Sequence, residues 1–498
     1  MRKALAMILT LVMLMSCLAG CGNNNEQTTT AAQTQAQTEA KTEAQTENSG
    51  GAAEATGESG KAEWFGTEDG KTITLKFWGG VQPEYGYDQL VANFNEEYKD
   101  KGVQVEYTRY VNDSQGNLQL ETYLMGGGEV DMFMGYGGMS TLSNRAESGL
   151  ILDMSEILEE EGFDLVEELG ASSMAGYTFE DGSVYGFPTK YENVRWLLIN
   201  VDMFEAAGVP IPYDGWTYSE FLDAVEKLTY GEGQDKVYGV SWTLKQSTNG
   251  LTSIMNSVLG TYATYKNDEA TELNYDHDVW RQGWNMLKTT LDNGWAISIE
   301  DEYAENMTVA NTFLAGKCAI STNVSQMRLC MDTTTYPHDF VTALVPGPVR
   351  DGDEYNTEFY RTHAGTSGAR DLFCIAASTE YPEACFEFAM WYVQGGMAPL
   401  AKGGRIPLWS GLDKEEVISV LMENANGSID LDSMRKYLAI DTTQGVPGIN
   451  NEISLAISGQ MGTVFSEEFQ ALCYGKQTVD ETIANLMSRG SALIESVK

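Results

Sequence analysis

The sequence is poor in basic residues, histidine and cysteine. Its 498 residues include 31 Lys and Arg against 72 Asp and Glu, which gives a formal charge of −41. A nucleic-acid-binding protein needs clustered Lys and Arg to displace counterions from phosphates, so we expect no nucleic-acid partner. With only 3 His and 7 Cys, a zinc enzyme is possible but not favoured.

Motifs for covalent or metal-assisted catalysis are also absent. The sequence has no Gly-x-Ser-x-Gly and no His-Glu-x-x-His, and the glycine runs at 126–128 and 137–138 lack the Lys-Ser/Thr of a phosphate loop. Two carboxylates could make a glycosidase, but among 72 acidic residues such a pair carries almost no information. We therefore expect a protein that is not an enzyme and holds no cofactor or metal.

What the sequence does have is aromatic residues. Its 10 Trp, 25 Tyr and 17 Phe need a core to hide in, which rules out a wholly disordered chain. At roughly 100–200 residues per domain, the length predicts two or three domains.

The N-terminus looks like an export signal. Arg2 and Lys3 precede an apolar run, residues 4–15, that is too short to span a bilayer comfortably. The run leads into Leu-Ala-Gly-Cys21, which resembles the lipobox of bacterial lipoproteins. The resemblance implies a signal peptide over residues 1–20 and a lipid with two acyl chains on Cys21, enough for durable membrane attachment. An ordinary cleavage site with an incidental cysteine, or an uncleaved membrane segment, remains the alternative.

A polar segment follows the lipobox. Residues 22–63 contain no aromatic residue and no Val, Ile, Leu or Met. Such a segment buries too little apolar surface to offset its ordering entropy. We expect residues 21–67 to be the lipidated cysteine and a disordered tether.

Five cysteines remain in the body of the chain, and their spacing matches no disulfide framework. They are Cys318, Cys330, Cys374, Cys385 and Cys473. Since five is odd, at least one thiol is unpaired or pairs between chains. Because Cys374 lies in the apolar run LFCIAA, where cysteine behaves as a small apolar residue, we expect free buried thiols rather than disulfides, although the sequence leaves their pairing open.

Strand and helix patterns alternate at the start of this body. Residues 72–78, 103–107 and 130–134 read as strands, and residues 87–98 and 118–125 have apolar residues at helical spacing. This order predicts an α/β fold with a parallel sheet. Ligands of such sheets bind at the carboxyl ends of the strands. Those ends carry Trp-Gly-Gly at 78–80 and Gly-Tyr-Gly-Gly at 135–138.

Further elements follow the same logic. Residues 195–200, 237–242 and 373–377 read as strands. Residues 201–207 read as a helix closed by Gly208. Thr217-Tyr-Ser-Glu220 has the spacing of a capping box before an apolar-periodic helix.

Ordered motifs along residues 72–498 resemble a known family. They are FWGG, VYGFPTKYENVRWLLINVDMFEAAGVPIP, WTYSEF, FLAGKCAIS, AASTEYPEACFEFAMWYV and GGRIPLWSG. In this order they resemble the extracellular solute-binding proteins of ABC importers, in the family-1 group typified by maltose- and oligosaccharide-binding proteins.

The resemblance implies a two-lobe periplasmic-binding-protein fold of the class II type. The ligand is then expected in a cleft between lobes that hinge strands join, with crossings near 186–188 and between 346 and 361. Residues 68–187 plus 350–400 form lobe 1 in this prediction. Residues 188–349 plus 401–498 form lobe 2.

A sugar offers hydroxyls to polar side chains and C–H faces to aromatic rings. Candidates for these contacts come from loops at the expected strand ends and crossings. They are Trp78, Tyr136, Tyr191, Glu192, Asn193, Trp242, Asn323, Arg361, His363, Arg405 and Trp409. For Trp78, Tyr136 and Trp242, core packing is the alternative, and His363 could be a hinge residue.

The resemblance implies a monomeric lipoprotein on the extracellular face of the bacterial cell membrane. It would bind a sugar or oligosaccharide and deliver it to ABC permease subunits. A surface glycosidase, or the same fold for a non-sugar solute, is the alternative function.

Overall fold

The structure is a computed structural model. It describes residues 64–179, 181–191, 196–245, 251–352, 369–423, 425–439 and 449–498. The expected signal peptide, Cys21 and all of the expected tether before residue 64 lie outside the described residues. No helix in the described part of the chain is both long enough and apolar enough to cross a bilayer.

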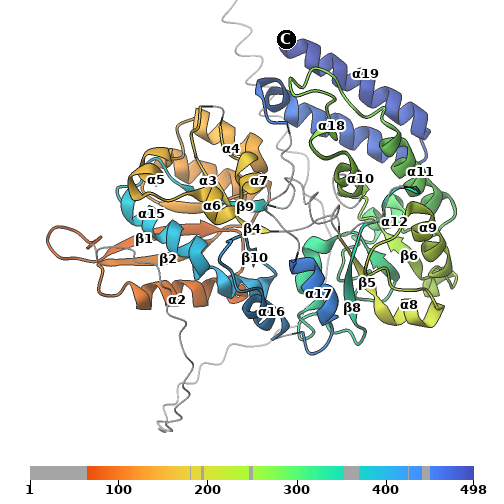
Figure 1. Cartoon of the computed structure of the whole chain (residues 1–498), viewed down its shortest axis with the longest axis horizontal. Helices are drawn as coiled ribbons and strands as arrows, with labels where there is room; N and C mark the ends of the chain where they lie inside the picture. The colour runs from red at the N-terminus through yellow and green to blue at the C-terminus, as the bar shows by residue number, and fades with distance from the viewer. Residues whose placement is uncertain are drawn as a thin grey trace, which may run out of the picture. The chain divides into compact units, whose positions relative to one another are not determined.

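Two sheets form the framework. The first has the strand order β10-β4-β9-β3-β1-β2 and the second the order β6-β7-β5-β8. The strands of the first sheet are β1 (Ile73–Gly79), β2 (Val103–Arg109), β3 (Met132–Gly135), β4 (Phe187–Tyr191), β9 (Ala369–Ile375) and β10 (Ile406–Pro407). Those of the second are β5 (Trp196–Asn200), β6 (Tyr238–Ser241), β7 (Cys318–Ser321) and β8 (Thr342–Pro346). Each sheet therefore draws strands from distant parts of the sequence (Figure 1).

Helices surround the sheets. Before β4 they are α2 (Tyr87–Glu97), α3 (Ser114–Gly126), α4 (Gly138–Glu147), α5 (Ser155–Glu161), α6 (Leu165–Leu169) and α7 (Ala171–Ala175). Between β5 and β8 they are α8 (Val201–Ala207), α9 (Tyr218–Lys227), α10 (Leu251–Leu259), α11 (Asp278–Asp292), α12 (Ile299–Ala304) and α13 (Met327–Cys330). After β9 they are α15 (Pro382–Trp391), α16 (Lys414–Met422), α17 (Leu431–Leu438), α18 (Glu452–Cys473) and α19 (Val479–Val497).

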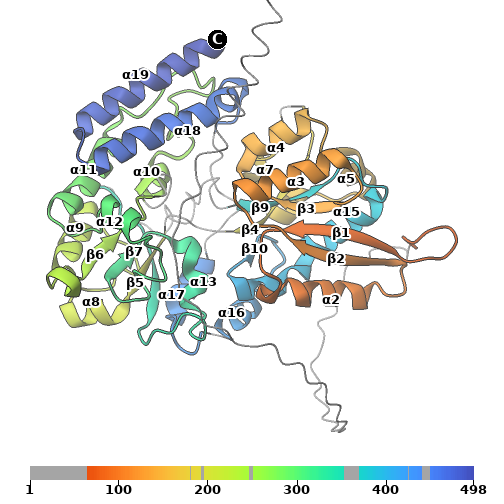
Figure 2. The ribbon, with the colours of Figure 1, turned by 180° about the vertical axis from the view of Figure 1, so that it is seen from behind.

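The predicted alternation of strands and helices around a parallel sheet is confirmed for the first three strands. β1 pairs in parallel with both β2 and β3. Successive side chains of β1 point to opposite faces of the sheet. Phe77 packs against Tyr87 of α2, and Trp78 packs against Tyr123 of α3. Figures 1 and 2 accordingly show α2 and α3 on opposite sides of β1 and β2.

Local signals set several helix ends. The Thr217 side chain accepts the N–H of Glu220, and the Glu220 carboxylate accepts the N–H of Thr217, so the predicted capping box begins α9. Gly208 ends α8 with a left-handed φ of 65°, which glycine adopts without steric penalty.

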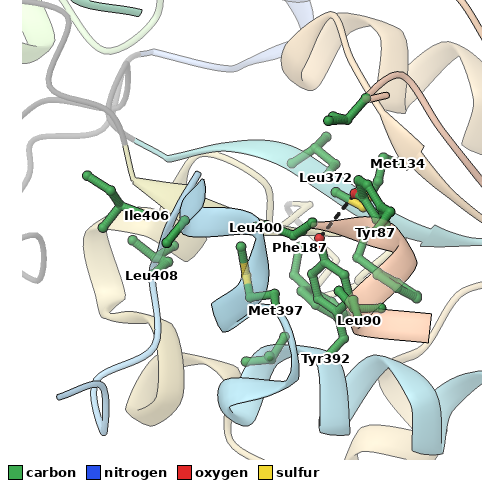
Figure 3. Packing of buried hydrophobic residues seen from close by; sticks show 14 of the residues in the cluster. Tyr87, Leu90, Met134, Phe187, Leu372, Tyr392, Met397, Leu400, Ile406 and Leu408 are labelled. Carbon is green, nitrogen blue, oxygen red and sulfur yellow. Dashed lines mark hydrogen bonds between the residues drawn. The ribbon is translucent and has the colours of Figure 1, made fainter. Parts of the chain in front are cut away.

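The core of the first lobe is aromatic. Phe77, Phe373 and Phe388 pack around Tyr392, with ring centroids 5.3–6.0 Å apart. Figure 3 shows the hydrogen bond between the hydroxyls of Tyr87 and Tyr392, which are 3.3 Å apart inside this core. Part of the aromatic content of the sequence therefore packs in the core of the first lobe.

The second sheet is buried on both faces. Every residue of β5, β7 and β8 is buried. Leu198 of β5 packs into the same cluster as the first lobe's core, while Leu197 and Ile199 join a separate cluster that includes α9, α11, α18 and α19. A sheet covered on both faces needs continuous apolar strands, which explains the sequence WLLIN in β5.

The chain passes between the sheets more than once. It leaves the first sheet after β4, builds the second from β5 to β8, and returns at β9. The predicted boundaries placed residues 188–191 and 401–410 in lobe 2. In the structure β4 and β10 instead pair with each other, and β4 with β9, within the first sheet. The return to the second sheet comes later, where α17 contacts β8.

The cysteines are free thiols, as expected. Cys318, Cys330, Cys374 and Cys385 are buried, and Cys473 is half-buried. Burial raises the pKa of Cys330 and of Cys374 to about 12. Since the thiolate is the reactive form, these side chains act as small apolar packing groups.

Candidate functional site

Five side chains gather at the carboxyl edge of the first sheet. β1, β3 and β4 end at this edge, and the antiparallel β9 and β10 begin there. The edge therefore collects Trp78, Tyr136, Lys190, Asp371 and Arg405. In open α/β sheets this is the edge at which ligands bind.

Tyr136 directly follows β3 and is held by polar contacts. Its hydroxyl accepts the N–H of Gly80 at 3.0 Å and shares a hydrogen bond with Arg405. A Cβ on Gly80 would lie 2.9 Å from that hydroxyl, so the close approach requires glycine. Burial raises the pKa of Tyr136, which keeps the phenol neutral and able to donate. As a whole residue, Tyr136 is half-buried.

At the carboxyl edge of the first sheet, the carboxylate of Asp371 lies between two cations. Asp371 Oδ2 lies 3.3 Å from Arg405 Nε and 3.7 Å from Lys190 Nζ. The three side chains are 11%, 20% and 14% exposed, respectively. Burial is the largest influence and by itself would lower the pKa of Arg405, but the charge of Asp371 and the neighbouring tyrosine hydroxyls together raise it. The guanidinium therefore stays charged, with donors for ligand oxygens.

The two other first-lobe candidates are less open. Trp78 is 7% exposed, and its ring lies 4.9 Å from that of Tyr123, so most of its surface is in the core. Trp409 is half-buried, and its Nε1 donates to Glu168 at 2.6 Å. Since β10 runs away from the carboxyl edge, Trp409 lies further from that edge than Arg405.

The second-lobe candidates lie at the carboxyl edge of the second sheet. Trp242 directly follows β6, and Asn323 lies two residues after β7, in strands that run parallel. Asn323 is 6% exposed, and its side-chain oxygen accepts from Ser325 at 3.0 Å.

Trp242 belongs to the core of the second lobe. It is 2% exposed, its Nε1 donates to Thr290 at 2.8 Å, and its ring packs against Phe221. In this conformation it offers no ring face for stacking on a sugar. Core packing, the alternative that the sequence left open for Trp242, agrees with this environment, because residues of α9 and α11 contact its ring and its Nε1.

Some of the predicted contact residues lie outside the described residues. They are Glu192, Asn193, Arg361 and His363, together with the side chain of Tyr191. The backbone of Tyr191 ends β4 and pairs with Ile406, so Tyr191 belongs to the carboxyl edge by position.

The sequence analysis missed Asp371 and Lys190. The available sequence signal for Asp371 was its position as an acidic residue directly before the apolar run LFCIAA. Its meaning depends on the pairing of β9 with β4, which local patterns do not reveal. Within the described ranges, no group of three or more His, Cys, Asp or Glu is placed to hold a metal ion.

A model of the family described as bacterial extracellular solute-binding protein matches residues 89–417. The chain belongs to this family. Members bind substrates rather than convert them, so this solute-binding protein is not an enzyme. No curated protein sequence matches the chain.

Solved structures show the fold of this solute-binding protein. A sugar transporter protein from Rhizobium etli, in an open conformation, is 18% identical with a TM-score of 0.62 over 86% of this chain and 100% of that chain. An ABC substrate-binding protein from Listeria monocytogenes in complex with cycloalternan is 16% identical, with the same TM-score and coverage. The sugar-binding protein MalE from Xanthomonas citri is 14% identical, with a TM-score of 0.58 over 85% and 98%. The α/β, two-lobe fold expected from the sequence is thereby confirmed.

Proposed function

We propose that this solute-binding protein captures a sugar or oligosaccharide between its lobes and delivers it to the permease subunits of an ABC importer. The carboxyl edge of the first sheet carries this proposal. There a half-buried tyrosine, Tyr136, stands beside the charged donors of Arg405 and Lys190 and the acceptor Asp371. An aromatic face beside charged hydrogen-bonding groups suits the apolar faces and hydroxyls of a sugar.

The names of the similar structures support the sugar class. They include a sugar transporter, a complex with cycloalternan and a sugar-binding MalE. The lipobox at Cys21 supports attachment to the extracellular face of the membrane through a lipid, and we propose that the protein acts there as a monomer.

Isothermal titration of the protein against a panel of neutral oligosaccharides, cycloalternan included, tests the sugar class. We expect at least one saccharide to bind tighter than about 1 mM, which corresponds to about −4 kcal/mol. If every saccharide binds more weakly, the sugar assignment fails, and a non-sugar solute in the same fold takes its place.

Two tyrosine variants then locate the site. Tyr136→Ala removes the ring and the hydroxyl contact to Gly80, and we expect at least tenfold weaker binding, about 1.4 kcal/mol. Tyr230→Ala is the matched control, because Tyr230 is 54% exposed and belongs to the second lobe, outside both candidate edges. Equal affinities of the two variants would remove Tyr136 from the binding site.

A further inference from the structure

A side chain of the second lobe rests on the first lobe. Arg328 belongs to α13, which follows β7 of the second sheet, and Tyr85 lies between β1 and α2 of the first lobe. The guanidinium carbon of Arg328 is 5.4 Å from the centre of the Tyr85 ring. A guanidinium within about 6 Å of a ring centre is attracted to the face of the ring. This cation–π contact therefore joins the two lobes directly.

The helix that carries Arg328 is fixed in the second lobe. The short helix η4 (Val324–Gln326), directly before α13, contacts β5. The hydroxyl of Ser428 donates to the carbonyl of Cys330 in α13 at 2.6 Å, and the carbonyl of Ser428 accepts the N–H of Thr342 in β8 at 2.8 Å. Since α13 is tied to two strands of the second sheet, a shift of Arg328 relative to the first lobe is a shift of the second sheet.

Two glycines of the first lobe shape the place where Arg328 rests. A Cβ on Gly403 would lie 3.0 Å from the Cβ of Tyr85, and a Cβ on Gly404 would lie 2.9 Å from the Cβ of Arg328. Gly404 also has a φ of +74°, a left-handed conformation that favours glycine. The first two residues of the motif GGRIPLWSG therefore let the main chain approach both side chains. We call Tyr85, Gly403 and Gly404 the Arg328 seat.

The Arg328 seat lies beside a crossing of the chain between the lobes. The helix η6 (Ala398–Gly403), which includes Gly403, contacts α16, and α17 further along the chain contacts β8. The chain therefore passes from the first lobe to the second between η6 and α17. A contact beside this crossing restrains rotation of one lobe against the other.

The ring of Tyr85 is the partner that the structure shows for the charge of Arg328, which forms no ion pair within the described ranges. The planar guanidinium of arginine stacks on an aromatic ring, whereas the ammonium of lysine is a compact and strongly hydrated charge. Both Arg328 and Tyr85 are half-buried. A partly desolvated contact of this kind is strong enough to change an equilibrium constant about fivefold.

We propose that Arg328 is a positioning residue that holds the second lobe on the first through the ring of Tyr85. It favours the arrangement in which the lobes touch at the Arg328 seat over arrangements in which they are further apart. This role does not depend on which solute the protein binds, and it can be measured without ligand.

Single-molecule energy transfer on the full-length, ligand-free protein tests this role. Dyes are attached to p-azidophenylalanine introduced at the exposed positions Glu159, in the first lobe, and Glu232, in the second. Arg328→Met keeps an apolar stem and removes the charge. We expect the ratio of molecules with touching lobes to molecules at larger separations to fall about fivefold. Arg328→Lys, which keeps a charge without the planar group, should give a smaller fall.

Variants of Tyr85 test whether Arg328 acts through the ring. Tyr85→Phe keeps the ring and should match wild type, whereas Tyr85→Leu should resemble Arg328→Met. If the two side chains act together, the effects of Arg328→Met and Tyr85→Leu are not additive. Arg281→Met is the matched control, because it removes a guanidinium whose ion pair with Asp480 joins α11 to α19 within the second lobe.

Several results would overturn the proposal. They are coincident distributions for wild type and Arg328→Met, additive effects of Arg328→Met and Tyr85→Leu, and an equal shift in Arg281→Met. Should Arg328→Met not fold, as judged by circular dichroism, Tyr85→Leu decides alone: a shift to larger separations supports the proposal, and a wild-type distribution refutes it. Failure of every saccharide to bind would defeat the proposed function but would not change this ligand-free result.

Discussion

At the scale of single residues, the carboxylate of Glu302 carries a burial penalty. The residue is 2% exposed, in α12, and its Oε2 accepts the N–H of Lys245 at 2.9 Å. Burial is the largest influence and raises the pKa of Glu302, although the N–H groups of Lys245 and Leu244 oppose it. Through this hydrogen bond to Lys245, Glu302 holds the loop that follows β6 at the carboxyl edge of the second sheet.

This burial predicts a pH effect on stability. Because the pKa of Glu302 is higher in the folded chain than in the unfolded chain, the folded chain binds its proton first as pH falls. The contribution of Glu302 to the free energy of unfolding therefore decreases as pH rises from the unfolded pKa, about 4.3, through the folded pKa. Glu302→Gln cannot titrate, so its stability relative to wild type should increase with pH over this window.

Urea unfolding of Glu302→Gln and wild type at a series of pH values measures this difference. Glu226→Gln, at an exposed position of α9, serves as the control for loss of one negative charge. A stability difference between Glu302→Gln and wild type that stays constant with pH would contradict the account.

At the scale of elements, Trp242 joins β6 to the helices that cover the second sheet. Its ring packs on Phe221 of α9, and its Nε1 binds Thr290 of α11. Trp242→Ala would leave a cavity in the core, and we expect a loss of about 3–5 kcal/mol in the free energy of unfolding. Trp242→Phe, which loses mainly the hydrogen bond and part of the ring, should lose less.

Chemical unfolding and saccharide titration of both Trp242 variants distinguish a core role from a ligand contact. If Trp242 is a core residue, its substitution lowers stability, and any loss of binding follows only from unfolding of the protein. A Trp242→Ala protein with full stability and weakened binding would return Trp242 to the ligand site.

The elements with local signals were predicted well from the sequence. The alternation in β1, the helical spacing in α2 and the capping box of α9 all depend on neighbours within a few residues. β10 has two residues and exists only because it pairs with β4, more than 200 residues earlier. Its place in the first sheet therefore could not be predicted from local pattern.

The candidate site was predictable to a similar extent. Tyr136 and Arg405 could be proposed from the sequence because they follow or precede strand patterns and motifs, and their contact with a ligand stays a prediction. Asp371 was not found, since its partners come from β4 and from the residue before β10. The burial of Trp242 could not be predicted, because strand-end position does not reveal whether helices cover the ring.

At the scale of the whole molecule, the two sheets differ in how they are built from the chain. The first sheet uses strands from residues 73–135, 187–191 and 369–407, whereas the strands of the second lie between residues 196 and 346. The second sheet is thus inserted in the sequence between β4 and β9 of the first. Under the function proposed above, a ligand that prefers one separation of the lobes shifts the population toward that separation, and the importer reads this shift.

The proposed membrane attachment through a lipid on Cys21 also belongs to this scale. Two acyl chains on one cysteine bind a bilayer far more durably than one. Cys21→Ser should therefore move the protein from the membrane fraction to the soluble fraction, or leave a heavier precursor that keeps residues 1–20. Cell fractionation with mass spectrometry of the N-terminus distinguishes these results from wild type. Cys17→Ser is the matched control, because Cys17 lies four residues earlier, within the expected signal peptide. A Cys21→Ser protein that is processed and membrane-bound like wild type would refute the lipobox assignment.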